Sequence, residues 1–551
     1  MKAYDVVIIG AGPSGIFTAL ELCNLDAGLK ILMVDSGRSI KKRACPARDI
    51  KRCTLCNPCG IMRGWGGAGA FSDGKLSLSE EVGGNIVDYI GRDKSKGYIR
   101  YADEMYVRFG SPDTVHGKDD RKVEEIMYEA SKHNIRLVPC PVRHMGTENA
   151  LDVLSAMYEH LVKQPGFEFR ELTEAVSINA ENGKVKSLTI RRTKQTSGLN
   201  GPNGAKDDDK ADNKAYGGTD GGTDNKADGG TDGKTDDKAV RGTDGGTDNK
   251  ADGGTGGKAN GANGGTDLAR DTGGLGDVEQ IGASYIVVAP GRAGAHWLKG
   301  VAEDLDMQVT NNEVDIGVRV EVPNSVMDHL TDHLYEAKLV YYSDTFENKV
   351  RTFCMNPGGH VSEEHYEGGL AVVNGHSYGD KEMRTANTNF ALLVSTRFTK
   401  PFNQPIEYGK YIASIGNMLT GGGIMVQRLG DLLKGRRTDE SRLKKGTTVP
   451  TLESAVPGDL SFVLPHRHLT SIIESLAAFD KLAPGLYSQN TLLYGVEVKF
   501  YSSKVKVDEQ FRTNVDGLYA IGDGAGITRG LMQASVTGVR VARDIIDRNQ
   551  S

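Results

Sequence analysis

The stretch Tyr4-Asp5-Val6-Val7-Ile8-Ile9-Gly10-Ala11-Gly12-Pro13-Ser14-Gly15 decides the fold of this chain. A short β-branched run, typical of a buried strand, ends at the first of three spaced glycines. The residues from Ile16 to Leu25 suit a helix, and a second apolar run, Ile31-Leu32-Met33-Val34, ends in Asp35. Strand, glycine turn, helix, strand and acid together form the dinucleotide-binding fingerprint.

Each glycine of this fingerprint has a separate task. Gly10 permits the tight turn, Gly12 leaves room for a pyrophosphate against bare backbone, and Gly15 lets the helix pack closely on the strand. The pyrophosphate is expected on the N–H groups at the start of the helix, which begins with Pro13 and Ser14.

The acid at the end of the second strand indicates which dinucleotide class fits. Asp35, followed by Ser36, stands twenty residues after Gly15, where a carboxylate accepts the hydroxyls of an adenosine ribose. An acid at this position argues against a ribose 2′-phosphate.

Composition sets the limits of the folded part. The chain has 551 residues, 67 basic and 73 acidic, for a net charge of −6. Residues 196–281 are almost entirely Gly, Asp, Thr, Lys, Asn and Ala, and Gly-Gly-Thr-Asp-Asn-Lys-Ala-Asp-Gly-Gly-Thr occurs at both 221 and 245. Such a segment cannot bury enough apolar surface to offset the entropy of ordering, so we expect a disordered insertion. Irregular spacing and missing large apolar residues argue against a calcium-binding repeat.

Charge and hydropathy exclude several classes of protein. Residues 206–279 hold 17 acidic and 10 basic residues, so the remainder is close to neutral, with 57 basic and 56 acidic residues, and carries no nucleic-acid footprint. No apolar run approaches the length of a membrane span. The N-terminus begins a core strand at once, which argues against a signal peptide. A cytoplasmic protein is expected.

Other segments predict secondary structure along the chain. Residues 94–134 and Glu148 to Leu161 have helical patterns, and Asn182-Gly183 between two alternating runs predicts a β-hairpin. Residues 305–500 differ in composition, with alternating stretches such as Val314 to Val322, and with helices expected near 388–397 and 468–479.

A second strand–glycine–helix junction lies near the C-terminus. Leu518 to Ile521 lead into Gly522-Asp523-Gly524, and a helix is expected from about Leu531 to Asn549. A nicotinamide enzyme needs no such return of the chain, whereas an FAD-binding domain of the glutathione-reductase type does. In that arrangement the carboxylate of Asp523 holds ribityl or phosphate-linked hydroxyls, and the following helix faces the pyrimidine end of the flavin.

Four segments carry a resemblance to a known family. They are Gly66 to Leu76, Ala289 to Arg292, Thr352 to Gly359 and Ile521 to Gly530. In these segments the chain resembles the largely uncharacterised family of FAD-dependent dehydrogenases. The resemblance implies FAD and a redox role, but it supplies no substrate.

The resemblance also implies a two-domain α/β flavoprotein. It has a Rossmann-like FAD-binding domain formed by residues 1–195, 282–304 and 501–551, and an inserted α+β substrate domain at 305–500. Within it, the residues expected to hold FAD are Gly10, Gly12, Pro13, Ser14, Gly15, Asp35, Ser36, Gly66, Gly67, Ser72, Lys75, Gly291, Gly522, Asp523, Arg529 and Gly530. Lys75 and Arg529 are candidates to stabilise the reduced flavin, because a cation near its N1–C2 carbonyl favours the anion. Cys354 and His360 are the candidate catalytic residues on the substrate side.

A cysteine cluster precedes the predicted flavin loop. Cys45, Cys53, Cys56 and Cys59 have the spacing C-x7-C-x2-C-x2-C, whose second part is of the ferredoxin type. A [4Fe–4S] cluster, a structural zinc ion and free thiols are the three interpretations.

The functional hypotheses follow from these sites. The first is an FAD oxidoreductase acting on a small organic substrate. The second is an electron-transfer flavoprotein that exchanges electrons with a protein partner through the cluster, and the third is a flavin monooxygenase. No second glycine fingerprint provides a domain for NAD(P)H, which leaves it at most a transient donor.

Overall fold

The fingerprint strand lies at the centre of a parallel arrangement. In the computed structural model, β1 (Lys2–Ile9) lies between β2 (Ile31–Val34) and β9 (Val278–Val288) and runs parallel to both. β6 (Phe167–Arg170) extends the sheet beyond β2, and β21 (Leu518–Ala520) pairs with β9. The structure describes residues 2–26, 28–46, 54, 56–72, 74–194, 278–366, 369–378, 381–399, 401–402, 404–500 and 504–550.

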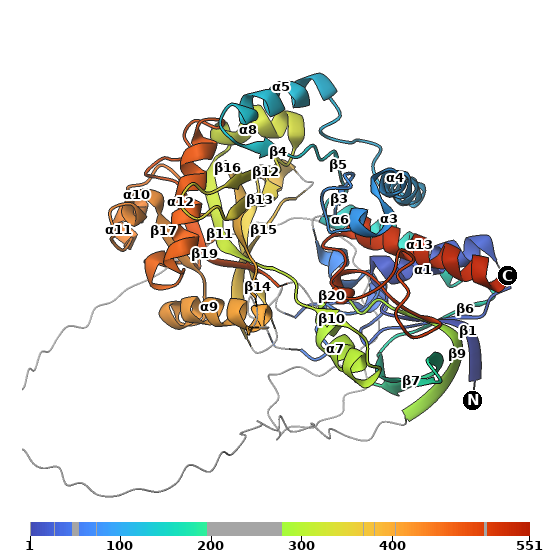
Figure 1. Cartoon of the computed structure of the whole chain (residues 1–551). Helices are drawn as coiled ribbons and strands as arrows, with labels where there is room; N and C mark the ends of the chain where they lie inside the picture. The colour runs from blue at the N-terminus through green and yellow to red at the C-terminus, as the bar shows by residue number, and fades with distance from the viewer. Residues whose placement is uncertain are drawn as a thin grey trace, which may run out of the picture. The chain divides into compact units, whose positions relative to one another are not determined.

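Two long helices pack on this sheet (Figure 1). They are α1 (Pro13–Leu25), which follows the fingerprint, and α13 (Leu531–Gln550), which closes the chain. Their backbones come very close where they cross, because a Cβ on Gly538 would lie 2.3 Å from the carbonyl oxygen of Ser14. The first and last helices of the chain therefore share one layer, as the two strand–glycine–helix junctions predict.

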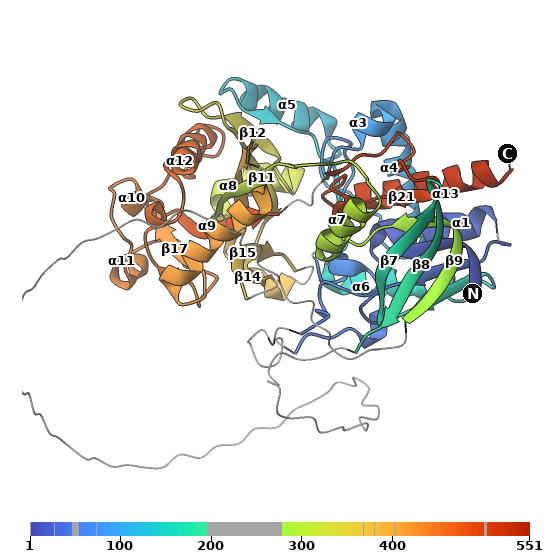
Figure 2. The same cartoon turned by 60° about the horizontal axis from the view of Figure 1, so that its bottom comes forward.

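The predicted hairpin is confirmed. β7 (Thr173–Glu181) and β8 (Lys184–Arg192) are antiparallel, and Asn182 and Gly183 between them have φ of 52° and 71°. β8 then pairs with β9 in an antiparallel manner, with Arg191 opposite Val278 (Figure 2). The sheet thus resumes at residue 278, before residue 282, where the second part of the FAD-binding domain is expected to begin. Residues 195–277, on which most of the predicted disordered insertion falls, lie outside the described residues.

A second sheet belongs to the C-terminal half of the chain. Its strand order is β18-β17-β19-β11-β16-β13-β12-β4. All but the last strand come from the segment predicted as the substrate domain, whereas β4 and the adjacent helix α5 come from near residue 130. The bounds are β4 (Arg136–Leu137), β11 (Val314–Pro323), β12 (Leu339–Tyr342), β13 (Lys349–Asn356), β16 (Asn387–Thr396), β17 (Met425–Arg428), β18 (Val456–Pro457) and β19 (Leu492–Lys499).

The helix expected at residues 388–397 is wrong, since these residues form most of β16. Phe390-Ala391-Leu392-Leu393-Val394 is a continuous apolar run, which does not distinguish a helix from a strand that is buried on both faces. β16 is such a strand, because it lies between β11 and β13 and every residue from Asn387 to Val394 is buried. The other expected helix of this segment is confirmed as α12 (His466–Asp480).

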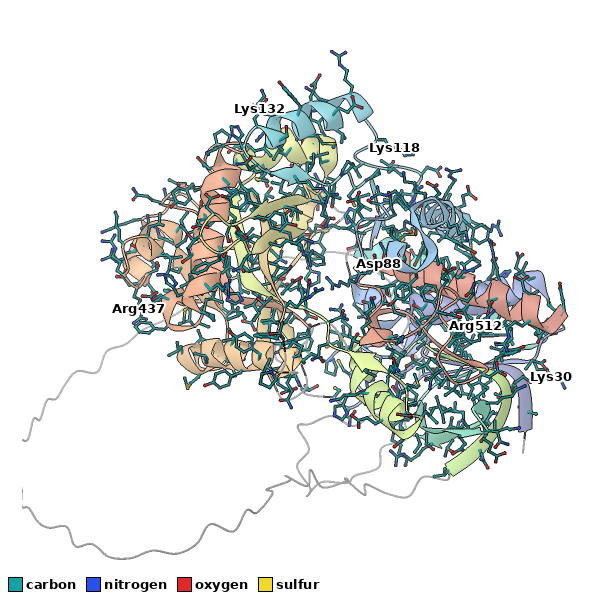
Figure 3. The ribbon with its side chains drawn as sticks, in the orientation of Figure 1. Lys30, Asp88, Lys118, Lys132, Arg437 and Arg512 are labelled. Carbon is teal, nitrogen blue, oxygen red and sulfur yellow. The ribbon has the colours of Figure 1, made fainter. Side chains whose placement is uncertain are left out.

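The chain crosses between the sheets at a short pair of strands. β10 (Val309–Thr310) on the outward path pairs with β20 (Lys504–Val505) on the return path. Each sheet has its own apolar core, and charged side chains such as Lys30, Lys132 and Arg437 point outward (Figure 3). The remaining larger elements are α4 (Arg92–Arg108), α5 (Asp120–Ser131), α6 (Thr147–Leu161), α7 (Ala295–Asp304), α8 (Asn324–Leu334), α9 (Pro405–Thr420), β3 (Lys75–Ser77), β5 (Val142–His144), β14 (His360–His365) and β15 (Ala371–His376).

A buried histidine predicts acid sensitivity of the second sheet. His468 on α12 packs against β16, its Nε2 lies 3.0 Å from the Thr396 hydroxyl, and burial lowers its pKa to about 4. The unfolded chain then binds more protons between about pH 6.5 and pH 4, so the free energy of unfolding falls as the pH falls through this range. We expect His468→Gln to reduce this acid-induced loss by about 2 to 3 kcal/mol.

Urea unfolding at pH 7 and pH 4.5 measures this difference. His466→Gln, an exposed position on the same helix, is the control and should follow the wild type. An unchanged acid-induced loss in His468→Gln would contradict the assignment.

Candidate functional site

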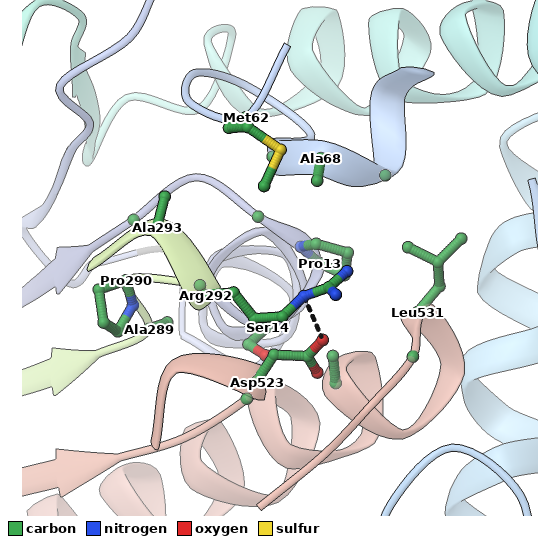
Figure 4. A pocket seen from close by; sticks show the side chains of 18 of the residues that line it. Pro13, Ser14, Met62, Ala68, Ala289, Pro290, Arg292, Ala293, Asp523 and Leu531 are labelled. Atoms are coloured by element: carbon green, nitrogen blue, oxygen red, sulfur yellow. Dashed lines mark ion pairs between the residues drawn. The ribbon is translucent and has the colours of Figure 1, made fainter. Parts of the chain in front are cut away.

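The predicted cofactor residues line one cavity. Its volume is about 510 Å³, and every residue expected to hold FAD lies on it except Gly15 and Gly66. Figure 4 shows its middle part, where Pro13 and Ser14 of α1 lie near Arg292 and Asp523. The two junctions that are far apart in the sequence therefore open into the same space.

The three fingerprint glycines have different surroundings. A Cβ on Gly10, whose φ is 103°, would lie 2.1 Å from the Ala289 carbonyl oxygen, and one on Gly15 would lie 2.0 Å from the Gly10 carbonyl oxygen. A Cβ on Gly12 would meet no protein atom within 4 Å. Gly10 and Gly15 thus serve packing, whereas the bare backbone at Gly12 faces open cavity, as a pyrophosphate requires.

Asp35 connects three segments around the cavity. Its Oδ2 accepts the Ala11 N–H at 2.8 Å, and its Oδ1 accepts the N–H groups of Gly37 and Gly64, each at 2.8 Å. A carboxylate has about four lone-pair positions, so a further acceptor site remains for a ribose hydroxyl. Asp35 therefore fixes the loop geometry whether or not it also contacts the cofactor.

Asp523 and Arg292, which both line the cavity, form an ion pair. The Arg292 Nε lies 3.8 Å from the Asp523 Oδ2 (Figure 4). The Thr528 hydroxyl donates to the Asp523 Oδ1 at 2.6 Å. Asp523 precedes α13 in the chain, and the N-terminus of α13 also opens into the cavity. Arg292 was not singled out by sequence reasoning, although it lies in the Ala289-Pro290-Gly291-Arg292 motif.

The C-terminal half supplies one wall of the same cavity. Glu336, Lys338, Phe353 and Cys354 line it. Lys75, from the glycine-rich loop, reaches this wall and donates to the Met355 carbonyl and the Asn356 Oδ1, both at 2.6 Å. Lys75 therefore joins the predicted flavin loop to the wall.

Cys354 lies at an irregular point of its strand. The pairing of β13 with β16 shifts register between Phe353 and Asn356, and Cys354 has a φ of 43°, a conformation that non-glycine residues rarely adopt. The Arg319 guanidinium donates to the Cys354 carbonyl at 3.3 Å and to the Glu497 carboxylate at 2.9 Å, and both charged side chains are fully buried. The buried Arg319–Glu497 pair therefore holds the backbone of Cys354 at this register shift.

His360 lies apart from Cys354. It does not line the cavity, and its Nε2 lies 3.0 Å from the Met383 carbonyl oxygen. Of the two predicted catalytic residues, the structure therefore brings Cys354 to the cavity but not His360.

A buried arginine organises the loop that carries the cysteines. Arg43 donates to four carbonyl groups, including those of Gly60 at 3.0 Å and Gly67 at 2.8 Å, and burial lowers its pKa to about 10. It thereby ties the end of the cysteine loop to the flavin loop.

The predicted metal ligands are only partly described. Cys45, Cys56 and Cys59 are half-buried, and Cys53 lies outside the described residues. Within the described part of the chain, no three His, Cys, Asp or Glu side chains are grouped to hold a metal ion. The metal site therefore stays a prediction. None of the described helices is long and apolar enough to span a bilayer.

A comparison with known protein families bears on the C-terminal half. Residues 313–500 match the family model of the FAD-dependent protein, C-terminal domain-like. This match supports the predicted resemblance, an FAD-dependent oxidoreductase and FAD as its cofactor. The sheets and helices of the structure confirm the α/β fold class.

Comparison with whole proteins identifies no substrate for this chain. The chain is similar to an uncharacterized protein of Clostridium beijerinckii, at 24% identity over 560 residues, which covers 98% of this chain and 80% of that protein. Among solved structures it is similar to pyridoxine 4-oxidase from Mesorbium loti, with TM-score 0.40, 11% identity and coverage of 98% and 99% of the two chains. It is also similar to L-proline dehydrogenase from P. horikoshii, with TM-score 0.36, 9% identity and coverage of 99% and 94%. Similarities this weak carry no information on what the present chain oxidises or reduces.

Because the space at Gly12 is open, we expect a larger side chain there to block FAD binding without disturbing folding. Gly12 has φ −81° and ψ −177°, which any residue can adopt. Gly12→Val should therefore fold, with its side chain in the space of the pyrophosphate, and should lose at least nine-tenths of its FAD. FAD released on denaturation and the melting temperature of the apoprotein measure the two effects.

Gly15→Ala is the matched control. Its Cβ would strike the Gly10 carbonyl oxygen, so it should lower the melting temperature of the apoprotein, which Gly12→Val should not. Wild-type FAD content in Gly12→Val would contradict pyrophosphate binding at this position.

Proposed function

We propose that this FAD-dependent oxidoreductase is a dehydrogenase or reductase of a small organic molecule, which binds between the flavin and the wall formed by the C-terminal half. The observation that carries the proposal is the continuity of the cavity. It extends from the Gly12 cradle and Asp35 to Lys338 and Cys354, so that a cofactor and a second molecule can lie in one space.

The chain's residues have distinct roles in this proposal. The N–H groups at the starts of α1 and α13 receive the pyrophosphate and the pyrimidine end of the flavin. Asp35 and Asp523 accept hydroxyls, and Gly66, Gly67 and Ser72 shape the loop around the ring. Lys75 and Arg529 supply positive charge, which favours the reduced flavin anion.

When bound, FAD supplies a two-electron acceptor for hydride. A substrate that loses a hydride from carbon also loses a proton from the neighbouring oxygen or nitrogen. We assign the uptake of that proton to the Cys354 thiolate, which becomes the thiol, because Cys354 lies on the wall and its backbone is held by Arg319. His360 has no such position.

The assignment predicts a difference between the two candidate catalytic residues. Cys354→Ser should lower turnover by about a hundredfold, the usual range for losing an acid–base group, while FAD content stays unchanged. His360→Gln, the control, should change turnover less than twofold. The measurement is dye-coupled oxidation of a panel of small alcohols, amines and organic acids. Full activity of Cys354→Ser on every oxidised compound would remove Cys354 from the mechanism.

An electron-transfer flavoprotein is the second candidate. One observation favours it: the loop carrying Cys56 and Cys59 leads directly into Met62 and Arg63, which line the cavity. A [4Fe–4S] cluster held by Cys45, Cys53, Cys56 and Cys59 would stand beside the flavin and open a one-electron route to a protein partner. No observation on the described residues favours zinc, a monooxygenase reaction or NAD(P)H as donor.

Iron content separates the two candidates. If the four cysteines hold a cubane, anaerobically purified protein should contain about four irons and four sulfides per chain. Cys56→Ser should remove most of the iron and leave FAD in place, because the cysteine loop is not the phosphate cradle. Cys140→Ser, at a buried thiol outside the cluster, is the control. A normal flavin spectrum without iron after anaerobic reconstitution would exclude the electron-transfer reading.

A further inference from the structure

Lys338 is a buried cation on the cavity wall. Its side chain is 10% exposed, and its Nζ lies 2.9 Å from the Glu336 Oε2. It also lies 5.2 Å from the centre of the Phe353 ring. Lys338 directly precedes β12 in the C-terminal half of the chain. It is not part of the dinucleotide-binding fingerprint.

The ammonium group of Lys338 has more donors than acceptors. An ammonium has three N–H donors, and the Glu336 carboxylate lies within reach of one of them, at 2.9 Å. Buried polar groups are almost always hydrogen-bonded. Since Lys338 lines the cavity, an acceptor on a bound molecule is the natural partner of the remaining donors.

The charge on Lys338 persists in this setting. Burial is the largest single influence and acts to lower its pKa, but the Glu336 carboxylate together with the sulfurs of Cys140 and Cys354 outweighs burial, and the pKa is raised. Glu336 is itself held in place, because its Oε1 accepts the Met355 N–H at 3.0 Å and lies 3.6 Å from the Lys75 Nζ. Lys338 thus presents a fixed positive charge rather than a mobile one.

The neighbours of Lys338 indicate what kind of molecule it receives. Phe353 offers an apolar face, and Ser77 and Cys354 lie on the same cavity. We propose that Lys338 binds the carboxylate of a small organic acid whose apolar part contacts Phe353, which makes such acids the substrate class of this enzyme. This inference rests on the proposed oxidoreductase function and narrows it.

Carboxylate binding can be measured without knowing the substrate. The probes are acetate, benzoate and phenylacetate, each compared with its neutral amide, and binding is followed on the holoenzyme by changes in the flavin absorption spectrum. At least one acid should bind tenfold or more tightly than its amide. Lys338→Met should abolish this preference, whereas Lys338→Arg should retain most of it.

Controls keep the outcome interpretable. Lys444→Met, at a side chain that is 80% exposed, should bind the acids as the wild type does. No preference for any acid over its amide, or an unchanged preference in Lys338→Met with full FAD content, would overturn the proposal. Tighter binding of inorganic phosphate than of every acid would overturn the carboxylate class. Failure of the proposed function is seen separately, as absence of turnover of every compound in the dye-coupled assay by a holoenzyme that retains its flavin spectrum.

Discussion

The carboxylate of Asp35 is the constraint on which the cofactor side of the molecule depends. It accepts N–H groups from the fingerprint loop at Ala11, from its own turn at Gly37 and from the glycine-rich loop at Gly64. Hydrogen bonds to an ionised acceptor are stronger than neutral ones. Three loops that are separate in the sequence are therefore held in one arrangement, and the walls of the cavity follow from it.

The opposite wall is held by charges that are taken out of water. Arg319 and Glu497 are fully buried and paired, and Lys499 lies 2.8 Å from the same glutamate. Such pairs give little net stability compared with apolar packing, but losing one partner is costly. Their value in this fold is geometric, since Arg319 holds the carbonyl of a strained cysteine. The Lys75 contacts with Met355 and Asn356 then fix this wall against the flavin loop.

Sequence reasoning found what depends on local pattern. The strand, turn and helix of the fingerprint, the Asn182-Gly183 hairpin and the closing helix α13 all have short-range signals, and each is present. The expectation of a helix at β16 is wrong because burial on both faces removes the alternation that identifies a strand. That burial comes from strands β11 and β13, which are distant in sequence.

Two buried cations, Arg43 and Lys338, have no local signal in the sequence. A solvent-exposed side chain is the normal expectation for an arginine or a lysine. Their burial follows from long-range contacts, with the carbonyls of Gly60 and Gly67 in one case and with Glu336 in the other. Cys354 was found by family resemblance, whereas its left-handed conformation depends on a register shift that only strand pairing creates.

The pairing of β8 with β9 bears on how this chain can change over evolutionary time. Arg191 and Val278 are opposite each other, so the chain leaves the sheet and re-enters it at the same place. Lengthening such a connection from a four-residue turn to roughly 85 residues costs only about 3 kcal/mol of closure entropy. Repeat expansion or contraction at this position therefore alters the length of the protein while leaving the register of the sheet, and the cavity beyond it, untouched.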